Sequence, residues 1–218
     1  MANEVPIKKL ILVPAVITLA VTLLRLAGEL MHWSPILFNP QPGGGGAIVG
    51  IAWLVPVFGI YFGLKLANAG QGPAAMGPAI VYSIVVFALV PALGFGAVKL
   101  GLDANGFAAF GMFVVLSVLG AVVAYRGWPA LGQTLLAYGL AARVPVAIVM
   151  LFAILGSWGT HYDVAPPNFP EMSAIAKWLL IGVVPQLTAW IWFTIAVGAI
   201  FGTLAVAVTG RARRPATA

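Results

Sequence analysis

Six runs of mostly apolar residues alternate along the chain with short segments rich in glycine, proline or polar residues. They cover residues 10–30, 47–66, 78–98, 107–125, 144–158 and 179–208. Most approach the length of about 20 apolar residues that a helix needs to cross a bilayer. The pattern therefore predicts an all-α integral membrane protein, a bundle of about six transmembrane helices that forms a single membrane domain over residues 1–218.

Two of the connecting segments are long for a compact bundle, in which a handful of residues usually suffices. They cover residues 31–46 and 156–173, and both are rich in proline and carry tryptophan. Because proline restricts the chain and aromatic rings need a packing partner, we expect both loops to be ordered. We expect them to pack on each other as a cap over the ends of the first and fifth helices.

The fifth apolar run is ambiguous, because Arg143 and then Pro145 interrupt the apolar stretch over residues 129–158. One interpretation is a single long helix with a buried arginine. The other is an interfacial helix over residues 129–142, anchored by polar and aromatic side chains, with the span following it. We favour the second, because a repeat within the chain places Arg143 in register with Lys9, at the edge of the first span.

That repeat joins the first and third helical hairpins. Each has a proline ahead of an apolar span that leads to a histidine and to an Asn/Phe/Pro triplet, and each following helix carries Val-Pro and then Gly-x-x-x-Gly. True duplication of the hairpins and chance, in a chain rich in these residues, both account for it. The glycine pairs allow helices to approach closely and predict packing within the chain, or with a second copy or a membrane-complex partner. They are Gly59/Gly63 and Gly198/Gly202.

Composition supports a lipid environment. Apolar residues make up 62% of the chain and charged residues 7%, whereas a soluble domain carries roughly 25% charged residues. The partner that composition implies is thus the lipid bilayer. The net charge of +6 does not indicate nucleic-acid binding, because the basic residues lie at the ends of the apolar runs and form no basic face.

The positions of these basic residues predict orientation in the membrane. Lys8, Lys9, Lys65, Arg126 and a basic tail over residues 209–218 fall on one side. We therefore expect a multi-pass protein of the cell membrane with both termini in the cytoplasm. The absence of cysteine excludes disulfides, iron–sulfur clusters and thiolate zinc sites, and the sequence implies no cofactor.

Candidate chemistry gathers at one end of the predicted bundle. Arg25 and Glu29 are spaced i, i+4 on one helix face and can pair. Charges within lipid are costly and are functional candidates by default, so these two and Arg143 form a candidate polar or ion pathway. An ion pair at the level of the lipid headgroups is the plainer interpretation of Arg25 and Glu29.

The two long loops hold a second candidate site, made of His32, His161, Asp163 and Glu171. Together with Glu29 these residues could form a metal or proton site. Imidazole and carboxylate groups suit zinc, iron or manganese. However, no recognisable ligand spacing supports a metal, and histidines beside tryptophans are also typical of the membrane interface. The identity of any metal stays open.

No catalytic motif occurs in the chain. The favoured hypothesis is a small transporter or channel-like protein. The alternative is a non-catalytic scaffold or assembly subunit of a larger membrane complex, and an intramembrane enzyme comes third. A water-accessible cavity at mid-membrane would separate the first two, because transporter sites lie there beside broken helices.

Overall fold

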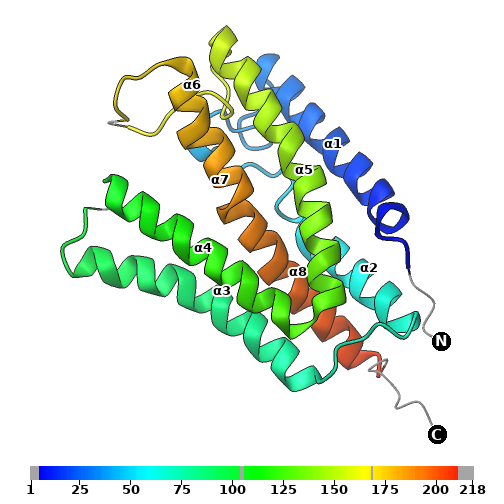
Figure 1. Ribbon diagram of the computed structural model, residues 1–218. Helices are drawn as coiled ribbons and strands as arrows, with labels where there is room; N and C mark the ends of the chain where they lie inside the picture. Colours follow the sequence, from blue (N-terminus) through cyan, green and yellow to red (C-terminus); the bar gives the residue numbers. More distant parts are fainter. Residues whose placement is uncertain (1–4, 104–105, 168, 211–218) are drawn as a thin grey trace, which may run out of the picture.

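The computed structural model describes residues 5–103, 106–167 and 169–210. Within these ranges the regular structure is helical throughout, and no strand is present. Five helical segments are long and apolar enough to cross a membrane, as expected for a multi-pass membrane protein. The elements are α1 (Ile7–Leu30), the short η1 (Pro42–Gly44), α2 (Leu54–Asn68), α3 (Met76–Lys99), α4 (Phe107–Gly127), α5 (Pro129–Gly156), α6 (Ala174–Lys177), η2 (Trp178–Val183), α7 (Val184–Leu187) and α8 (Ala189–Val208) (Figure 1).

Helix α2 is shorter than the sequence predicts. The expected helix over residues 47–66 begins only at Leu54, and α2 has 15 residues, or about 22 Å of helix. The hydrocarbon core of a bilayer is about 30 Å thick. Residues 45–53 are non-helical. They begin within the glycine run 43–46, in which Gly43, Gly44 and Gly46 have positive φ angles. This backbone conformation disfavours an earlier helix start.

The largest departure from the sequence prediction concerns α5. It is one continuous helix of 28 residues, Pro129–Gly156, so the predicted division into an interfacial helix and a separate span is wrong. Arg143 lies 14 residues after its first residue and 13 before its last, about 20 Å from either end. Pro145 lies inside the helix without ending it. A proline removes one backbone hydrogen bond of the helix, and this loss is tolerated where neighbouring helices pack around the freed backbone groups.

Helix α8 lies at the centre of the bundle and packs against α2, α3, α4 and α5, while α1 packs against α5. Where α2 meets α8, a Cβ atom on Gly59 would lie 2.5 Å from the Gly198 carbonyl oxygen, and one on Gly63 would lie 2.7 Å from that of Gly202. The two Gly-x-x-x-Gly pairs therefore face each other within the chain. If the first and third hairpins were related by a twofold axis, equivalent glycines would meet in this way. The duplication of the hairpins stays a prediction.

The last segment, Ala174–Val208, is helical but irregular. After α6 it passes through the π-helical turn η2 and the short helix α7. The backbone then breaks at Thr188, with φ −120° and ψ −75°, before α8 begins. Pro185 has no N–H to offer the turn before it. Turns of this kind often accompany functional sites, and this one lies beside the cavity described below.

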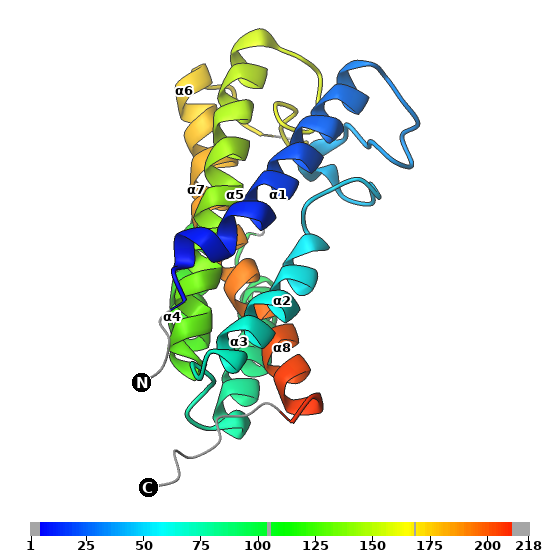
Figure 2. The same cartoon turned by 90° about the vertical axis from the view of Figure 1, so that its right-hand side faces the viewer.

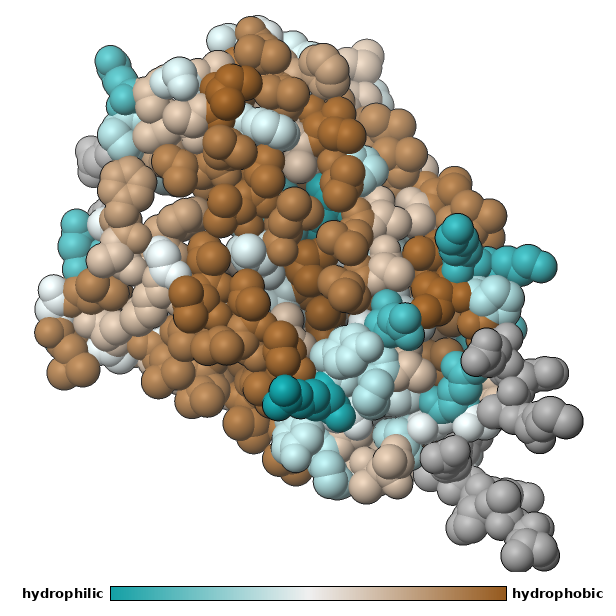
Figure 3. Space-filling view, in the orientation of Figure 1, coloured by the Kyte–Doolittle hydropathy of each residue, from teal (hydrophilic) through white to brown (hydrophobic). Residues whose placement is uncertain are grey.

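The connections 31–53 and 157–173 gather at one end of the bundle, here called the loop end (Figure 2). Helices α1 and α5 run toward the loop end, and α2 and α8 run away from it (Figures 1 and 2). The face seen in Figure 3 is largely hydrophobic, and most of its hydrophilic residues lie toward the two ends of the bundle. The predicted basic tail lies outside the described residues from residue 211 onward.

Candidate functional site

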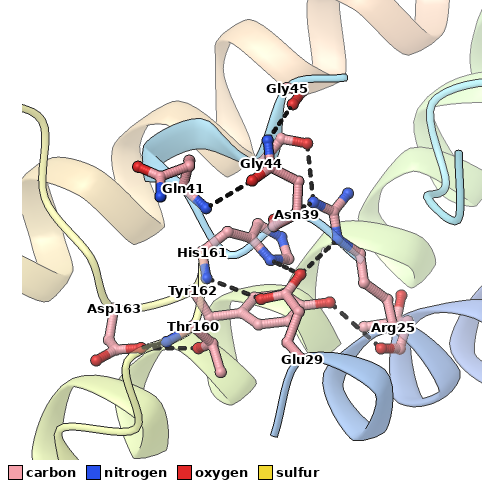
Figure 4. A network of polar contacts seen from close by, with 11 residues as sticks. Arg25, Glu29, Asn39, Gln41, Gly44, Gly45, Thr160, His161, Tyr162 and Asp163 are labelled. Carbon is pink, nitrogen blue, oxygen red and sulfur yellow. Dashed lines mark hydrogen bonds and ion pairs between the residues drawn. The ribbon is translucent and has the colours of Figure 1, made fainter. Parts of the chain in front are cut away.

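Glu29 is the centre of a buried polar cluster at the loop end. Its Oε1 accepts a hydrogen bond from Arg25 Nε at 2.8 Å and lies 2.5 Å from His161 Nδ1. Its Oε2 accepts the backbone N–H of His161 at 2.8 Å. The Glu29 side chain has no exposed surface. The i, i+4 pairing of Arg25 and Glu29 is thus present, and it is joined by a residue 132 positions away (Figure 4).

The same cluster connects the two long loops. Arg25 Nη2 donates to the Gly44 carbonyl at 2.8 Å and to the Asn39 carbonyl at 3.2 Å. Gly44 has φ +61°, and a Cβ atom there would overlap the Arg25 guanidinium and lie 2.6 Å from the His161 ring. Only glycine fits this conformation and this contact. The expected packing of the loops on each other is therefore seen at Gly44 and His161 (Figure 4).

His161 lies in surroundings that disfavour its charged form. Burial lowers its pKa below the usual value; the hydrogen bond to Glu29 opposes this effect, and the charge of Arg25 adds to it. A carboxylate can only accept, so the ring hydrogen lies on Nδ1. Tyr162 packs on the imidazole, with ring centres 3.8 Å apart, and donates its hydroxyl to the Thr22 carbonyl at 3.3 Å. Burial also raises the pKa of Tyr162 well above its usual range.

Arg143 presents a different situation from Arg25, because no ion pair within the described ranges reaches it. It is 4% exposed. Its Nη1 makes one long contact of 3.5 Å with Gln186 Oε1, and its Nε has no hydrogen-bond partner. The guanidinium carbon lies 4.2 Å from the ring centre of Trp190. The positive charge is therefore buried against an amide and an indole, without a counterion among the residues that the structure describes.

A cavity of about 850 Å³ connects these two regions. At one end it is lined by Arg25, His161 and the glycines of the first long loop; deeper in the bundle it is lined by Arg143, Gln186 and Trp190. Two arginines, Arg25 and Arg143, line it, and Glu29, which is not among the described lining residues, pairs with Arg25. The interior of the cavity thus carries one uncompensated positive charge.

The four residues of the predicted loop site have different surroundings. His32 and Glu171 are exposed, while Asp163 accepts hydrogen bonds from the backbone and hydroxyl of Thr160 and from the Gly159 N–H, so it orders its own loop. Among the residues that the structure describes, no group of three potential ligands could hold a metal. His161 alone of the four belongs to the cluster, and its partner is Glu29.

Sequence reasoning missed Gln186 and Trp190 as site residues. A usable signal existed for Gln186, because an amide side chain directly after a proline within an apolar run needs a polar partner. Trp190 offered none, since tryptophan is common in membrane proteins and only the fold places its ring beneath Arg143. No family model, curated protein or solved structure matches the chain.

Proposed function

We propose that this protein is a small membrane transporter that takes an anion-bearing substrate into the cavity beside Arg143. The observation that carries the proposal is the burial of Arg143 at the middle of α5 without a counterion. Arginine is the residue best suited to carboxylate and phosphate groups, because its planar fork binds them with two parallel hydrogen bonds. The open Nε edge of Arg143 leaves part of that fork free.

Energetics favour an anion over an empty site. A charge at the centre of a membrane helix costs several kcal/mol. Stacking on Trp190 returns about 2 kcal/mol when the contact is desolvated, and the long contact with Gln186 adds little. An anion in the cavity would supply the missing compensation. A cation would meet the same unpaired charge and be repelled.

The surroundings of the cavity favour transport over a scaffold role. Residues 45–53 and the irregular segment from Trp178 to Thr188 border it. Non-helical backbone at membrane depth is tolerated where it lines a water-filled cavity or is buried in protein, and broken helices of this kind surround transporter sites. A scaffold would be expected to fill this volume with apolar side chains.

The proposal includes six crossings and cytoplasmic termini in the cell membrane. Helix α2 and the non-helical residues 45–53 before it together make the second crossing. The first turn of α1 and the ends of α2 and α4, away from the loop end, carry Lys8, Lys9, Lys65 and Arg126. The excess of positive charge is expected on the cytoplasmic side, which places the loop end outside.

Thiol labelling tests the proposal, because the chain has no cysteine and every introduced thiol is unique. Ile181→Cys places a thiol on the cavity wall, and Leu155→Cys, on the exposed face of α5, is the control. In proteoliposomes we compare a negatively charged with a positively charged methanethiosulfonate reagent. A cleft of one sign raises the local concentration of opposite charges roughly tenfold or more.

We expect Ile181→Cys to react faster with the anionic reagent, from both sides of the membrane, and to lose this preference when Arg143→Gln is added. Leu155→Cys should show no such charge preference. Equal or reversed preference at Ile181→Cys would refute the anion site. Labelling from one side only would refute transport, and no labelling from either side would favour the scaffold.

A further inference from the structure

One side of the cavity is lined by apolar residues. On that side it is lined by the first turns of α4, with Phe107, Phe110 and Phe113, and by loop residues 164, 166, 167, 169 and 170 together with Leu180 and Ile181. Helix α4 packs on α3, α5 and α8. Figure 3 shows the surface hollowed between the start of α4 and the loop 157–173.

This lateral opening faces the region that lipid occupies if the chain crosses the membrane as proposed. The side chains around it are those expected at a boundary with lipid: Phe107 is 67% exposed and Phe113 is 36% exposed. Arg143 and Gln186 lie deeper in the cavity, and Arg25 and His161 line its loop end. The opening and the charge thus belong to one continuous space with an apolar mouth and a cationic interior.

The size of the cavity argues against a small free anion. About 850 Å³ is near the upper end of the 300–1,000 Å³ typical of sites for drug-sized ligands. An inorganic phosphate or a short carboxylate would fill only a small part of it. A ligand that compensates Arg143 and also covers the aromatic wall needs an acidic group joined to a long apolar chain.

We infer that the substrate is an anionic amphiphile, a lipid that carries a phosphate or carboxylate headgroup, and that it enters sideways between the start of α4 and the segment 164–181. Its acidic group binds Arg143 beside Gln186 and Trp190. Its chain lies along Phe110 and Phe113 and leaves through the lateral opening. This inference rests on the proposed anion site and adds the class of substrate and its route of entry.

Trp190 provides a built-in reporter, because its ring lies directly under the Arg143 guanidinium. The protein in lipid nanodiscs is titrated with phosphatidic acid brominated on the chain carbons nearest the headgroup, and with phosphatidylcholine brominated in the same way. The Trp190→Phe variant gives the fluorescence of the other six of the seven tryptophans, and subtracting it from the wild-type signal leaves that of Trp190. Brominated chains quench an indole only on contact, so the difference reports occupancy near Arg143.

We expect phosphatidic acid to quench the Trp190 signal at a mole fraction roughly tenfold lower than phosphatidylcholine, a difference of about 1.4 kcal/mol. Arg143→Gln should abolish this preference, and Arg126→Gln, at the exposed end of α4, should keep it. Equal quenching by the two lipids, or a preference that survives Arg143→Gln, would overturn the inference. Displacement of the lipid by an equal concentration of inorganic phosphate would do the same and would identify a free anion as the ligand.

A second variant tests the route of entry without altering Arg143. Phe110→Trp in the Trp190→Phe background places an indole at the lateral opening, and Leu100→Trp, 91% exposed at the end of α3, is its control. At Phe110→Trp, brominated phosphatidic acid should quench more strongly than brominated phosphatidylcholine. At Leu100→Trp, the two lipids should quench equally. Equal responses at Phe110→Trp would exclude the lateral route.

The two sets of experiments fail separately. If the thiol at Ile181→Cys prefers the anionic reagent but the lipids are not distinguished, the anion site stands and the lipid class is wrong. If the lipids are distinguished through Arg143 but the thiol is labelled from one side only, the lipid class stands and transport is wrong.

Discussion

The guanidinium of Arg143 lies over the ring of Trp190, with 4.2 Å between the guanidinium carbon and the ring centre. The two residues belong to α5 and α8, so the contact fixes the depth of the arginine relative to the central helix. It also covers one face of the guanidinium and leaves its edge for hydrogen bonds. The N–H donors of a guanidinium point outward in the plane of the group, so a ring stacked on its face does not block them. This geometry allows Arg143 to bind an acidic group.

The first prediction concerns the Glu29 cluster. In the part of the chain that the structure describes, Glu29 is the only carboxylate that pairs with Arg25, and it also accepts a hydrogen bond from His161. Glu29→Gln removes this carboxylate. Breaking a buried ion pair by removing one partner typically costs 3–5 kcal/mol, so we expect a loss of about 3 kcal/mol in the free energy of unfolding. Thermal unfolding in detergent measures it. Glu171→Gln, at an exposed position, should unfold at the wild-type temperature.

The second prediction is a loss of stability in mild acid. Because burial holds the folded-state pKa of His161 below the usual value of about 6.5, the unfolded chain binds a proton first as the pH falls. The contribution of His161 is therefore fully present above about pH 6.5 and declines below it, toward the folded-state pKa. The slope of the unfolding temperature against pH should flatten in His161→Asn. The exposed His32→Asn should keep the wild-type slope, and an unchanged slope in His161→Asn would contradict the assignment.

The third prediction separates backbone strain from close contact in the glycine run. Gly44→Ala and Gly46→Ala both place a side chain at a positive φ, +61° and +79°, but only at Gly44 would the new Cβ meet other atoms, those of Arg25 and His161. The strain alone costs about 1–2 kcal/mol, and overpacking adds about 1–3 kcal/mol. Gly44→Ala should therefore unfold at the lower temperature of the two. Equal unfolding temperatures would mean that the loops do not pack at this point.

The fourth prediction tests the close approach of α2 and α8. Gly63→Ala would place a Cβ atom 2.7 Å from the Gly202 carbonyl oxygen, whereas nothing lies within 4 Å of the Cβ position at Gly94 in α3. Alanine is the better helix former by about 1 kcal/mol, so Gly94→Ala should stabilise the protein. Gly63→Ala should destabilise it by about 1–3 kcal/mol. Opposite signs in the two unfolding temperatures are the expected result.

Local spacing in the sequence was sufficient for several features. The lengths of the apolar runs predicted the helices α1, α3 and α4 closely, because hydrophobicity and length suffice for a bilayer-crossing helix. The i, i+4 spacing predicted the pairing of Arg25 with Glu29, since that spacing places two side chains on one face of a helix. The glycine spacing predicted close helix packing, but left open whether the partner was another helix of this chain or another protein.

The remaining features depended on contacts between distant residues. Arg143 and Pro145 carry the local signals of a helix end, yet α5 continues through them, because Trp190 and Gln186 of the last segment surround the arginine. The sequence placed His161 in a group of possible partners that included Glu29 of the first helix, and only the tertiary structure pairs these two residues.

The sequence by itself thus determined a lipid-adapted helical chain with polar residues at costly positions. Only the tertiary structure decided which of those residues meet and which keeps an unpaired charge. The physical reason is that helix formation and lipid solvation depend on neighbours within about one turn and on the surrounding medium. The compensation of a buried charge depends instead on whichever side chains the packing of distant helices brings within hydrogen-bond distance. For Arg25 packing supplied a carboxylate, and for Arg143 it supplied an indole and an open cavity.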